Sequence, residues 1–273
     1  MSVSTVWLVG RPVAHSLSPA MHNAAFAMLG LPHRYETHEV AAAELPATFD
    51  RLRREGMLGA NVTIPHKEAA LRLVDEASEE ARRIGAVNTV ARRGSRLVGD
   101  NTDRYGFRMA LEESACVPSG EQVLVLGAGG AARACVLEIL ADNDVLVASR
   151  TLERARTLVE SLRTPRGGSV RAISWDEARR LKKVGLLVNA TPLGLHGEDV
   201  LAGFALRDLP LMVADLVPTA EETPLVRRAR QAQHVRVMDG LLMLLHQAAR
   251  SFTVWTGSEA PLRAMRAALP RPV

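Results

Sequence analysis

The stretch QVLVLGAGGAARA (residues 122–134) decides how this chain folds. A run suited to a buried strand ends at Gly127, and a helix-forming segment follows the glycines directly. Gly127, Gly129 and Ala132 stand in the G-x-G-x-x-G/A order, in which glycines let the backbone approach a pyrophosphate at a helix N-terminus. The alternative is a tight turn that binds no ligand. The strand-glycine-helix setting favours a dinucleotide site.

Short β-rich runs alternate with helical stretches along most of the chain, which indicates an α/β fold with a mostly parallel sheet. We expect the first helix to run from Ser18 to about Leu29, with Ser18 as N-cap and Pro19 at the first helical position. The Pro118-Ser119-Gly120 stretch is the clearest break between two halves. Strands are expected at 5–9, 34–39, 59–63 and 87–91, and then at 122–127, 145–149, 186–190 and 211–215. Each of the last three strands is expected to be preceded by a helix. Two final helices are expected at about 240–256 and 259–268.

The composition is that of a globular chain. Its 273 residues are 47% hydrophobic and only 4% aromatic, so Ala, Val and Leu must build the core of one large domain or two smaller ones. No apolar run approaches the ~18 residues of a membrane span, and no basic segment precedes the first apolar run as in a signal peptide. Cys116 and Cys135 form neither metal spacing nor a disulfide framework. We expect a reducing, cytoplasmic location.

The net charge of +4 and pI near 9.6 do not indicate a nucleic-acid-binding protein. The arginines are interspersed with acids, as in LERARTLVE (152–160), a pattern typical of solvated helix faces. A nucleic-acid reader would need a concentrated basic stripe, often with aromatic residues for stacking. The mild positive balance suits small anionic ligands.

The end of the strand at 145–149 indicates which dinucleotide is bound. An NAD site usually places Asp or Glu there for the ribose 2′-hydroxyl. This chain has Ser149-Arg150-Thr151, with Arg154 one helical turn on. Guanidinium groups suit a 2′-phosphate, so NADP is favoured over NAD. On the alternative interpretation, Thr151 is an N-cap and Arg154 an ordinary surface residue, and Thr151 could serve both purposes.

A nicotinamide cofactor needs a proton-transfer group in the other half, and ANVTIPHKEAA (60–70) offers one. Asn61 and Thr63 are two apart on a predicted strand, so their side chains share a face. Pro65 ends that strand and Lys67 lies in the first turn of the next helix. A lysine ammonium beside a carboxylate could deliver a proton to a forming alkoxide, or take it in the reverse direction.

The carboxylate candidate is Asp103 in GDNTD (99–103), just ahead of a helical stretch. Its alternative role is an ordinary N-cap aspartate. Asn88, in GAVNTV (85–90), could likewise be no more than a polar strand residue. Together with Asn61 and Thr63 it would supply neutral hydrogen bonds to a polyhydroxylated substrate.

Taken in order, these motifs resemble the shikimate dehydrogenase family, which interconverts 3-dehydroshikimate and shikimate. The resemblance covers essentially the whole chain. It implies a substrate-binding and catalytic domain at 1–104, a Rossmann-type NADP-binding domain at 105–240, and C-terminal helices at 241–273 that pack on the substrate domain. The matching stretches are PVAHSLSPAMHNAAF (12–26), GANVTIPHKEAA (59–70), IGAVNTV (84–90), GDNTD (99–103), LGAGGAARA (126–134), VNATPLG (188–194) and DGLLMLLHQAA (239–249).

Residue by residue, the resemblance implies that Lys67 and Asp103 are the catalytic pair. It implies substrate contacts, with the two serines facing a carboxylate, for Ser16, Ser18, Asn61, Thr63, Asn88 and Gln247. It implies NADP binding by Gly127, Ala128, Gly129, Gly130, Ala131, Ser149, Arg150, Thr151 and Arg154, and positions near the ribose and nicotinamide for Asn189, Ala190, Thr191, Leu216 and Gly240. No metal is implied, the partner is a small shikimate-like carboxylate, and the protein is expected to be a monomer or homodimer.

Several positions depart from the family pattern. Ser149 replaces the usual Asn, Arg104 replaces a common Gly after the catalytic Asp, and Ala220 replaces a Pro. Pro218 stands where the family has a Tyr whose hydroxyl contacts the substrate. Losing such a contact costs about 1–3 kcal/mol, roughly ten- to a hundredfold in catalytic efficiency. A paralogue acting on quinate, aminoshikimate or a related cyclic hydroxy acid is therefore the alternative. A non-catalytic ligand-binding regulator is disfavoured by the retained Lys–Asp pair.

Overall fold

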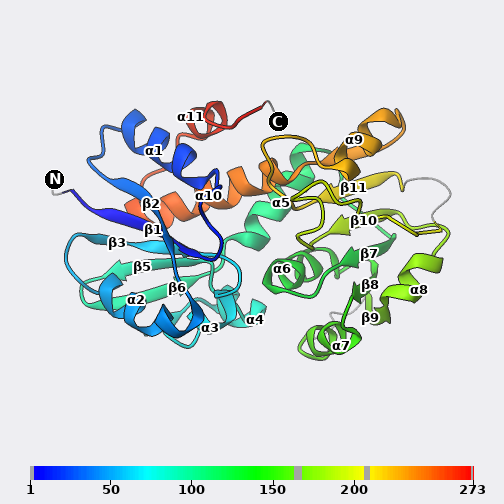
Figure 1. Cartoon of the computed structure of the whole chain (residues 1–273), viewed down its shortest axis with the longest axis horizontal. Coiled ribbons are helices and arrows are strands. Elements are labelled where there is room, and N and C mark those ends of the chain that lie inside the picture. The colour runs from blue at the N-terminus through cyan, green and yellow to red at the C-terminus, as the bar shows by residue number, and fades with distance from the viewer. Residues whose placement is uncertain (1–2, 163–167, 206–209, 272) are drawn as a thin grey trace. The chain divides into compact units, whose positions relative to one another are not determined.

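The structure is a computed structural model, and it describes residues 3–162, 168–205, 210–271 and 273. The chain forms two compact units (Figure 1). Unit 1 contains the residues up to Gly106 and those from Leu244 to Arg271, and unit 2 contains Phe107–Met243. The divisions fall inside helices α5 (Asp103–Glu113) and α10 (Gly240–Thr256). The Pro118–Gly120 stretch, which the sequence favoured as the boundary, lies within unit 2 instead.

Unit 1 is built on a six-stranded mixed sheet with the order β2-β1-β3-β5-β6-β4. The first three strands are parallel, whereas β5 pairs antiparallel with both β3 and β6. Strands β5 and β6 form a hairpin whose two-residue turn begins at Gly94, where φ is +63° and glycine avoids steric strain. The strands are β1 (Thr5–Gly10), β2 (Arg34–Glu39), β3 (Met57–Val62), β4 (Glu76–Ala77), β5 (Thr89–Arg93) and β6 (Arg96–Asp100).

The two faces of this sheet are covered by different helices, because successive strand side chains point to opposite sides. In β3, Ala60 and Val62 join the core cluster of Phe49 on α2, while Asn61 hydrogen-bonds Ser251 on α10. Figure 1 shows α1, α10 and α11 on one side of the sheet and α2 on the other. The helices of unit 1 are α1 (Ser18–Met28), the 3-10 helix η1 (Ala42–Glu44), α2 (Leu45–Leu52), α3 (Lys67–Ala70), α4 (Glu79–Ile84) and α11 (Leu262–Ala267).

Unit 2 is built on a six-stranded sheet in which all neighbouring strands are parallel, with the order β12-β11-β10-β7-β8-β9. Numbered from β7, this is the 3-2-1-4-5-6 order of the Rossmann fold. The order reverses between β7 and β10, so their carboxyl ends form the expected ligand position. The strands are β7 (Gln122–Leu126), β8 (Asp144–Ser149), β9 (Ser169–Ser174), β10 (Leu186–Asn189), β11 (Met212–Asp215) and β12 (Arg236–Met238).

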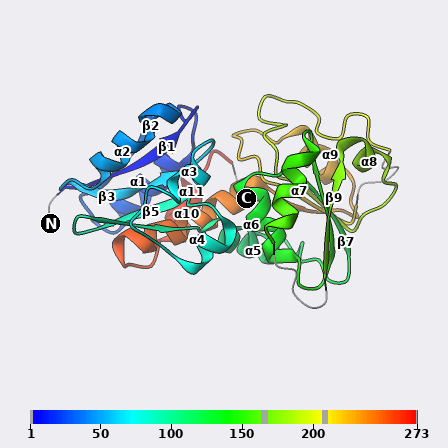
Figure 2. The same cartoon turned by 90° about the horizontal axis from the view of Figure 1, so that it is seen from below.

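Helices lie on both faces of the unit 2 sheet, as buried parallel strands require. Figure 2 shows α6 on one side and α8 on the other. One face packs Leu124 and Leu126 of β7 against Ala178 of α8 and Leu225 of α9 in a single buried cluster. The helices are α6 (Gly130–Ile139), α7 (Leu152–Glu160), α8 (Trp175–Arg180) and α9 (Pro224–Gln231).

The predicted fold class is confirmed, and every predicted strand is present with shifts of a few residues at its ends. The predicted helix before β11 is wrong: the described residues of 190–211 form turns, in which Gly194, Gly197 and Gly203 have positive φ that a helix cannot accommodate. Strands β4, β6, β9 and β12 were not predicted, because they are short or largely exposed and lack a clear apolar pattern. In the described part of the chain, no helix is long and apolar enough to span a membrane.

Candidate active site

Lys67 and Asp103 form an ion pair in unit 1. Lys67 begins α3 immediately after the turn that follows β3, and Asp103 is the first residue of α5. The Lys67 Nζ lies 2.5 Å from Asp103 Oδ2, while Asn88 Nδ2 donates to the other oxygen, Oδ1, at 2.8 Å. The Asp103 side chain is 5% exposed and that of Lys67 17% exposed. The carboxylate is therefore fixed from two sides, and the lysine side chain is the more accessible of the two.

Asn88 is more than a polar strand residue, since it stands just before β5 and connects several site residues. Its Oδ1 accepts from the Thr102 backbone N–H at 2.9 Å and from the Thr89 hydroxyl at 2.9 Å. Gln247 of α10 brings its Oε1 to 3.4 Å from Asn88 Nδ2. The sequence placed Asn88, Asp103 and Gln247 in separate motifs, and the fold brings them together.

Asn61 belongs to the same buried network. Its Nδ2 lies 3.0 Å from the Asn88 carbonyl oxygen, 3.2 Å from Thr89 Oγ1 and 3.2 Å from Ser251 Oγ. Thr63 lies one residue beyond the end of β3, so the prediction that both residues are on the strand is wrong by one position. The Thr63 N–H still bonds the Val9 carbonyl at 2.9 Å, which continues the strand geometry.

The two serines lie at the start of α1. Ser18 is the first helical residue and Leu17 occupies the N-cap position, so the prediction of Ser18 as N-cap is wrong by one residue. The Ser18 N–H donates to Ser16 Oγ at 3.3 Å. Ser18 is buried and Ser16 half-buried. The Ser18 side chain, freed from a capping role, is available for other contacts.

The glycine turn of unit 2 lies where the sheet order reverses. Gly127 has φ of +115°, and a Cβ there would lie 2.6 Å from the carbonyl oxygen of Ala190 at the end of β10. Gly129 differs: its φ is −93°, and a Cβ added there would meet no described atom within 4 Å. Packing therefore requires glycine at 127, whereas the space beside Gly129 is open at the N-terminus of α6, beside Ala128, Gly130 and Ala131.

The segment after β8 carries the predicted 2′-phosphate residues. Ser149 ends the strand, Arg150 is exposed, and Arg154 is exposed within the first turn of α7. Thr151 occupies the N-cap position of α7 as predicted, although the described residues give it no side-chain capping bond. The two guanidinium groups are thus both accessible at the carboxyl end of the strand next to β7.

A buried carboxylate, Asp215, connects the loops after β10 and β11. Its Oδ1 accepts from Asn189 Nδ2 at 2.9 Å and its Oδ2 from the Thr223 hydroxyl at 2.6 Å. Asn189 Oδ1 in turn accepts from the backbone N–H and the hydroxyl of Thr191. Burial raises the pKa of Asp215 to about 6, against the opposing effect of hydrogen bonds from Thr223, Val217 and Asn189, and with a smaller contribution from the Asp239 carboxylate.

Gly240 fixes the start of α10 against the same loop. A Cβ at Gly240 would lie 2.6 Å from the Val217 carbonyl oxygen and 2.8 Å from the Leu216 carbonyl carbon. Asn189, Ala190, Thr191, Leu216 and Gly240, which the sequence grouped around the ribose and nicotinamide, are therefore parts of one hydrogen-bonded and close-packed arrangement in unit 2.

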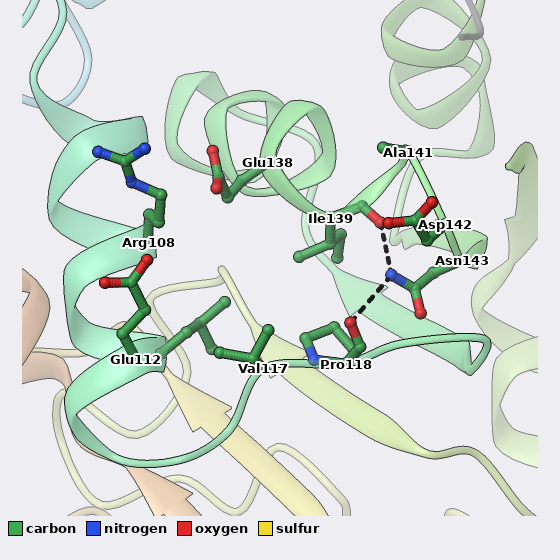
Figure 3. Close-up of a pocket in the computed structure, with 10 residues that line it drawn as sticks. Arg108, Glu112, Val117, Pro118, Glu138, Ile139, Ala141, Asp142 and Asn143 are labelled. Carbon is green, nitrogen blue, oxygen red and sulfur yellow. Dashed lines mark hydrogen bonds between the residues drawn. The ribbon is translucent and has the colours of Figure 1, made fainter. Parts of the chain in front are cut away.

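A surface hollow in unit 2 is a poor candidate for the dinucleotide site. It lies between α5 and the end of α6, with Arg108, Glu112 and Glu138 at its rim (Figure 3). Asn143 lines it, but its Nδ2 is engaged by the carbonyls of Ile139 and Pro118. These residues precede β7 and β8, so the hollow lies at the amino end of the sheet, opposite the glycine turn.

Comparison with known proteins identifies the family. A model of the shikimate dehydrogenase substrate-binding domain matches residues 8–90, and one of the shikimate 5′-dehydrogenase C-terminal domain matches residues 240–269. A shikimate dehydrogenase (NADP(+)) from Symbiobacterium thermophilum is 42% identical over 270 residues, covering 96% of this chain and 92% of its own. This chain belongs to the shikimate dehydrogenase family.

Solved structures of similar proteins share the fold. Shikimate 5-dehydrogenase from Thermus thermophilus, in complex with NADP(H) and shikimate, superposes with a TM-score of 0.84 at 38% identity, covering 99% of this chain and 100% of that one. Quinate dehydrogenase from Corynebacterium glutamicum, in complex with NAD, gives a TM-score of 0.85 at 29% identity, covering 98% and 99%. The resemblance inferred from the motifs is confirmed.

Two departures from the shikimate dehydrogenase pattern can now be placed. The Arg104 guanidinium lies 3.4 Å from both carboxylate oxygens of Glu80 on α4, so part of its charge is already matched within unit 1. Pro218 is exposed in the loop that Asp215 anchors, and it offers no hydroxyl. Nothing in the structure explains the replacement of Asn by Ser149.

The sequence missed several residues that support the candidate sites of the two units. All are buried and polar, and two of them lie inside quoted motifs: Thr89 follows Asn88, and Thr102 precedes Asp103. Asp215 ends an otherwise apolar strand, which was the signal that could have revealed it. Tyr35 and Ser251 carried no comparable signal, because a tyrosine in a strand and a serine in a helix are ordinary.

Proposed function

We propose that this chain interconverts shikimate and 3-dehydroshikimate with NADP, using Lys67 and Asp103 for proton transfer. The observation that carries the proposal is the ion pair of Lys67 Nζ with Asp103 Oδ2 at 2.5 Å, held by Asn88 on the other carboxylate oxygen. Membership of a family whose relatives are named NADP-dependent shikimate dehydrogenases supports it.

Reduction of a ketone requires a hydride at carbon and a proton at oxygen, and Lys67 is the group positioned to handle the proton. In the reducing direction its ammonium protonates the forming alkoxide, and in the oxidising direction its nitrogen takes the hydroxyl proton. Asp103 holds Nζ in place, and Asn88 keeps the carboxylate from rotating. General acid–base catalysis of this kind contributes about 10²- to 10⁴-fold.

The glycine turn fits a dinucleotide. Gly129 has ordinary backbone angles and open space where a Cβ would stand, so packing does not require glycine there, whereas close approach of a pyrophosphate does. The first N–H groups of α6 would hold the phosphates, and Arg150 and Arg154 would hold the 2′-phosphate. When bound, NADP supplies or accepts the hydride. We assign unit 2 to the cofactor on this basis.

We assign unit 1 to the substrate. Ser16 and Ser18 would bind the carboxylate, and Thr63 with the amides of Asn61, Asn88 and Gln247 would bind ring hydroxyls. The burial of Asn61 and Asn88 supports this assignment. A buried amide has a fixed orientation, and it is left without a hydrogen-bond partner if the ligand lacks the matching hydroxyl.

Steady-state oxidation of shikimate and quinate, each with NADP and with NAD, tests the proposal. We expect efficient turnover with shikimate and NADP. Lys67→Ala should lower turnover by about 10²- to 10⁴-fold while NADP affinity stays within a few-fold. Lys183→Ala, which alters an exposed lysine of unit 2, is the matched control. Turnover of Lys67→Ala within a few-fold of wild type would remove Lys67 from the mechanism.

A second candidate function is the oxidation of quinate or a related cyclic hydroxy acid. It is favoured by Pro218, which provides no hydroxyl at the position where the family pattern has a tyrosine. The similarity to quinate dehydrogenase from Corynebacterium glutamicum is consistent with it. Negligible shikimate turnover with clear quinate turnover in the same assay would decide for this candidate.

A further inference from the structure

Tyr35 is the buried residue of an otherwise accessible edge strand. In β2 it is 2% exposed, whereas the other residues of the strand are exposed or half-buried. Its ring stacks on His22 of α1, with centroids 4.3 Å apart and planes 13° from parallel, and lies 6.0 Å from the Trp255 ring of α10. These contacts fix the ring and aim its hydroxyl inward.

The hydroxyl of Tyr35 lies between two residues to which the proposed function gives substrate contacts. It donates to Asn61 Oδ1 at 2.8 Å, and the Ser18 side chain lies near the phenol oxygen. A single phenol group therefore joins the proposed carboxylate-binding end of the site to the proposed hydroxyl-binding end. It has no part in proton transfer by Lys67 and Asp103.

The hydrogen bonds of the Asn61 amide determine which of its atoms can face a ligand. The Asn61 nitrogen faces the Asn88 carbonyl at 3.0 Å, which can only accept, so the two Nδ2 hydrogens are used within the protein. The amide oxygen receives Tyr35 on one lone pair and has a second lone pair available. Asn61 thus presents an acceptor, which recognises a hydroxyl that donates.

We propose that Tyr35 is a positioning and specificity-determining residue, whose hydroxyl acts together with the Asn88 carbonyl to hold the Asn61 amide with its oxygen toward a substrate hydroxyl. This inference rests on the proposed function. The His22 ring, on which the Tyr35 ring stacks, is neutral, because burial lowers the pKa of His22 to about 3. Removing only the Tyr35 hydroxyl leaves the stack intact and removes the hydrogen bond that restrains the oxygen end of the Asn61 amide.

Tyr35→Phe is the direct test, and Tyr105→Phe is the matched control, since the chain has two tyrosines. Tyr105 is 37% exposed, and the Arg250 guanidinium lies 5.8 Å from the centre of its ring. We expect Tyr35→Phe to raise KM for shikimate about ten-fold, with kcat and KM for NADP within about three-fold. The control should leave all three within about two-fold. An unchanged KM for shikimate in Tyr35→Phe would overturn the inference.

A double-mutant cycle separates positioning from a general structural effect. If Tyr35 acts through Asn61, adding Tyr35→Phe to Asn61→Ala should change KM by less than about two-fold. An undiminished effect in that background would refute action through Asn61. Shikimate analogues that lack one of the two non-reacting hydroxyls give a second measurement: one of them should be penalised in wild type and much less in Tyr35→Phe.

A spectroscopic measurement covers the case in which Tyr35→Phe does not fold. In the Tyr105→Phe protein, 3-fluorotyrosine labels Tyr35 alone. Its ¹⁹F resonance should shift when shikimate is added and stay in place when NADP alone is added. No shift at saturating shikimate would overturn the inference. Failure of the proposed function would be distinct, because wild type itself would then not turn over shikimate with NADP.

Discussion

The buried carboxylate of Asp215 should make the stability of unit 2 depend on pH in a predictable direction. Asp215 is 0% exposed, and its pKa rises from 3.8 to about 6 in the fold, mainly because burial penalises the charged form. Each pKa unit corresponds to about 1.4 kcal/mol, so ionisation of Asp215 in the folded state costs about 3 kcal/mol.

The direction of this pH dependence follows from how tightly Asp215 binds its proton in the folded and in the unfolded chain. Below pH 3.8 the carboxyl is protonated in both states, and its contribution to stability is fully present. Between pH 3.8 and about 6 the folded state binds the proton more tightly than the unfolded state, so stability decreases as pH rises. Above about pH 7 both states are ionised and the contribution of this group is constant.

Asp215→Asn isolates this contribution, because the amide does not titrate. The free energy of unfolding of wild type minus that of Asp215→Asn should fall by about 2 kcal/mol between pH 4 and pH 7, because part of the full effect lies below pH 4. The absolute difference at any one pH also contains a lost hydrogen bond, because the amide has one accepting oxygen and cannot accept from both Thr223 and Asn189. The pH dependence, not the offset, carries the prediction.

Denaturant unfolding at several pH values between 4 and 8 provides the measurement. The chain has three tryptophans, and Trp175 is the one in unit 2, so 5-fluorotryptophan NMR follows that unit separately. Asp176→Asn, at a side chain 73% exposed on α8, is the control and should give no comparable pH dependence. A wild-type minus Asp215→Asn difference that stays constant across this range would refute the reasoning.

Three further predictions concern the proposed cofactor and substrate sites. Arg150→Ala should weaken NADPH binding about ten-fold and leave NADH binding unchanged; equal losses in a fluorescence titration would contradict the 2′-phosphate assignment. Gly129→Ala should lower NADP affinity at an unchanged Tm, because the added Cβ enters open space where the pyrophosphate would bind. Gly127→Ala should instead lower Tm, because its Cβ would lie 2.6 Å from the Ala190 oxygen and φ is +115°. A reversed pattern in calorimetry would argue against the dinucleotide site. Pro218→Tyr should raise kcat/KM for shikimate about ten-fold if the absent hydroxyl matters, and no gain in steady-state kinetics would show that this hydroxyl is dispensable.

The fold could be predicted where a strong local pattern coincided with a strict physical requirement. An apolar strand, a glycine turn and a helix at 122–134 fixed the Rossmann-type half, because few other arrangements bury such a strand on both faces. Exposed edge strands such as β9 have no such pattern, and only their neighbours define them. The missing helix before β11 was predicted from alternation alone, against local glycines that opposed it.

The candidate site was predictable for residues that stand in motifs, and not for those that orient them. Asn61 bonds Tyr35 from 26 residues away and Ser251 from 190 residues away, distances at which no local pattern operates. The order of the sheet, with β1 between β2 and β3, and the return of α10 to unit 1 are what bring these groups together. An amide in a motif can present either its oxygen or its nitrogen to a ligand. Here the buried partners of Asn61 decide which of the two atoms it presents. Part of the substrate specificity that we propose therefore resides in buried residues, such as Tyr35, that no sequence motif marks.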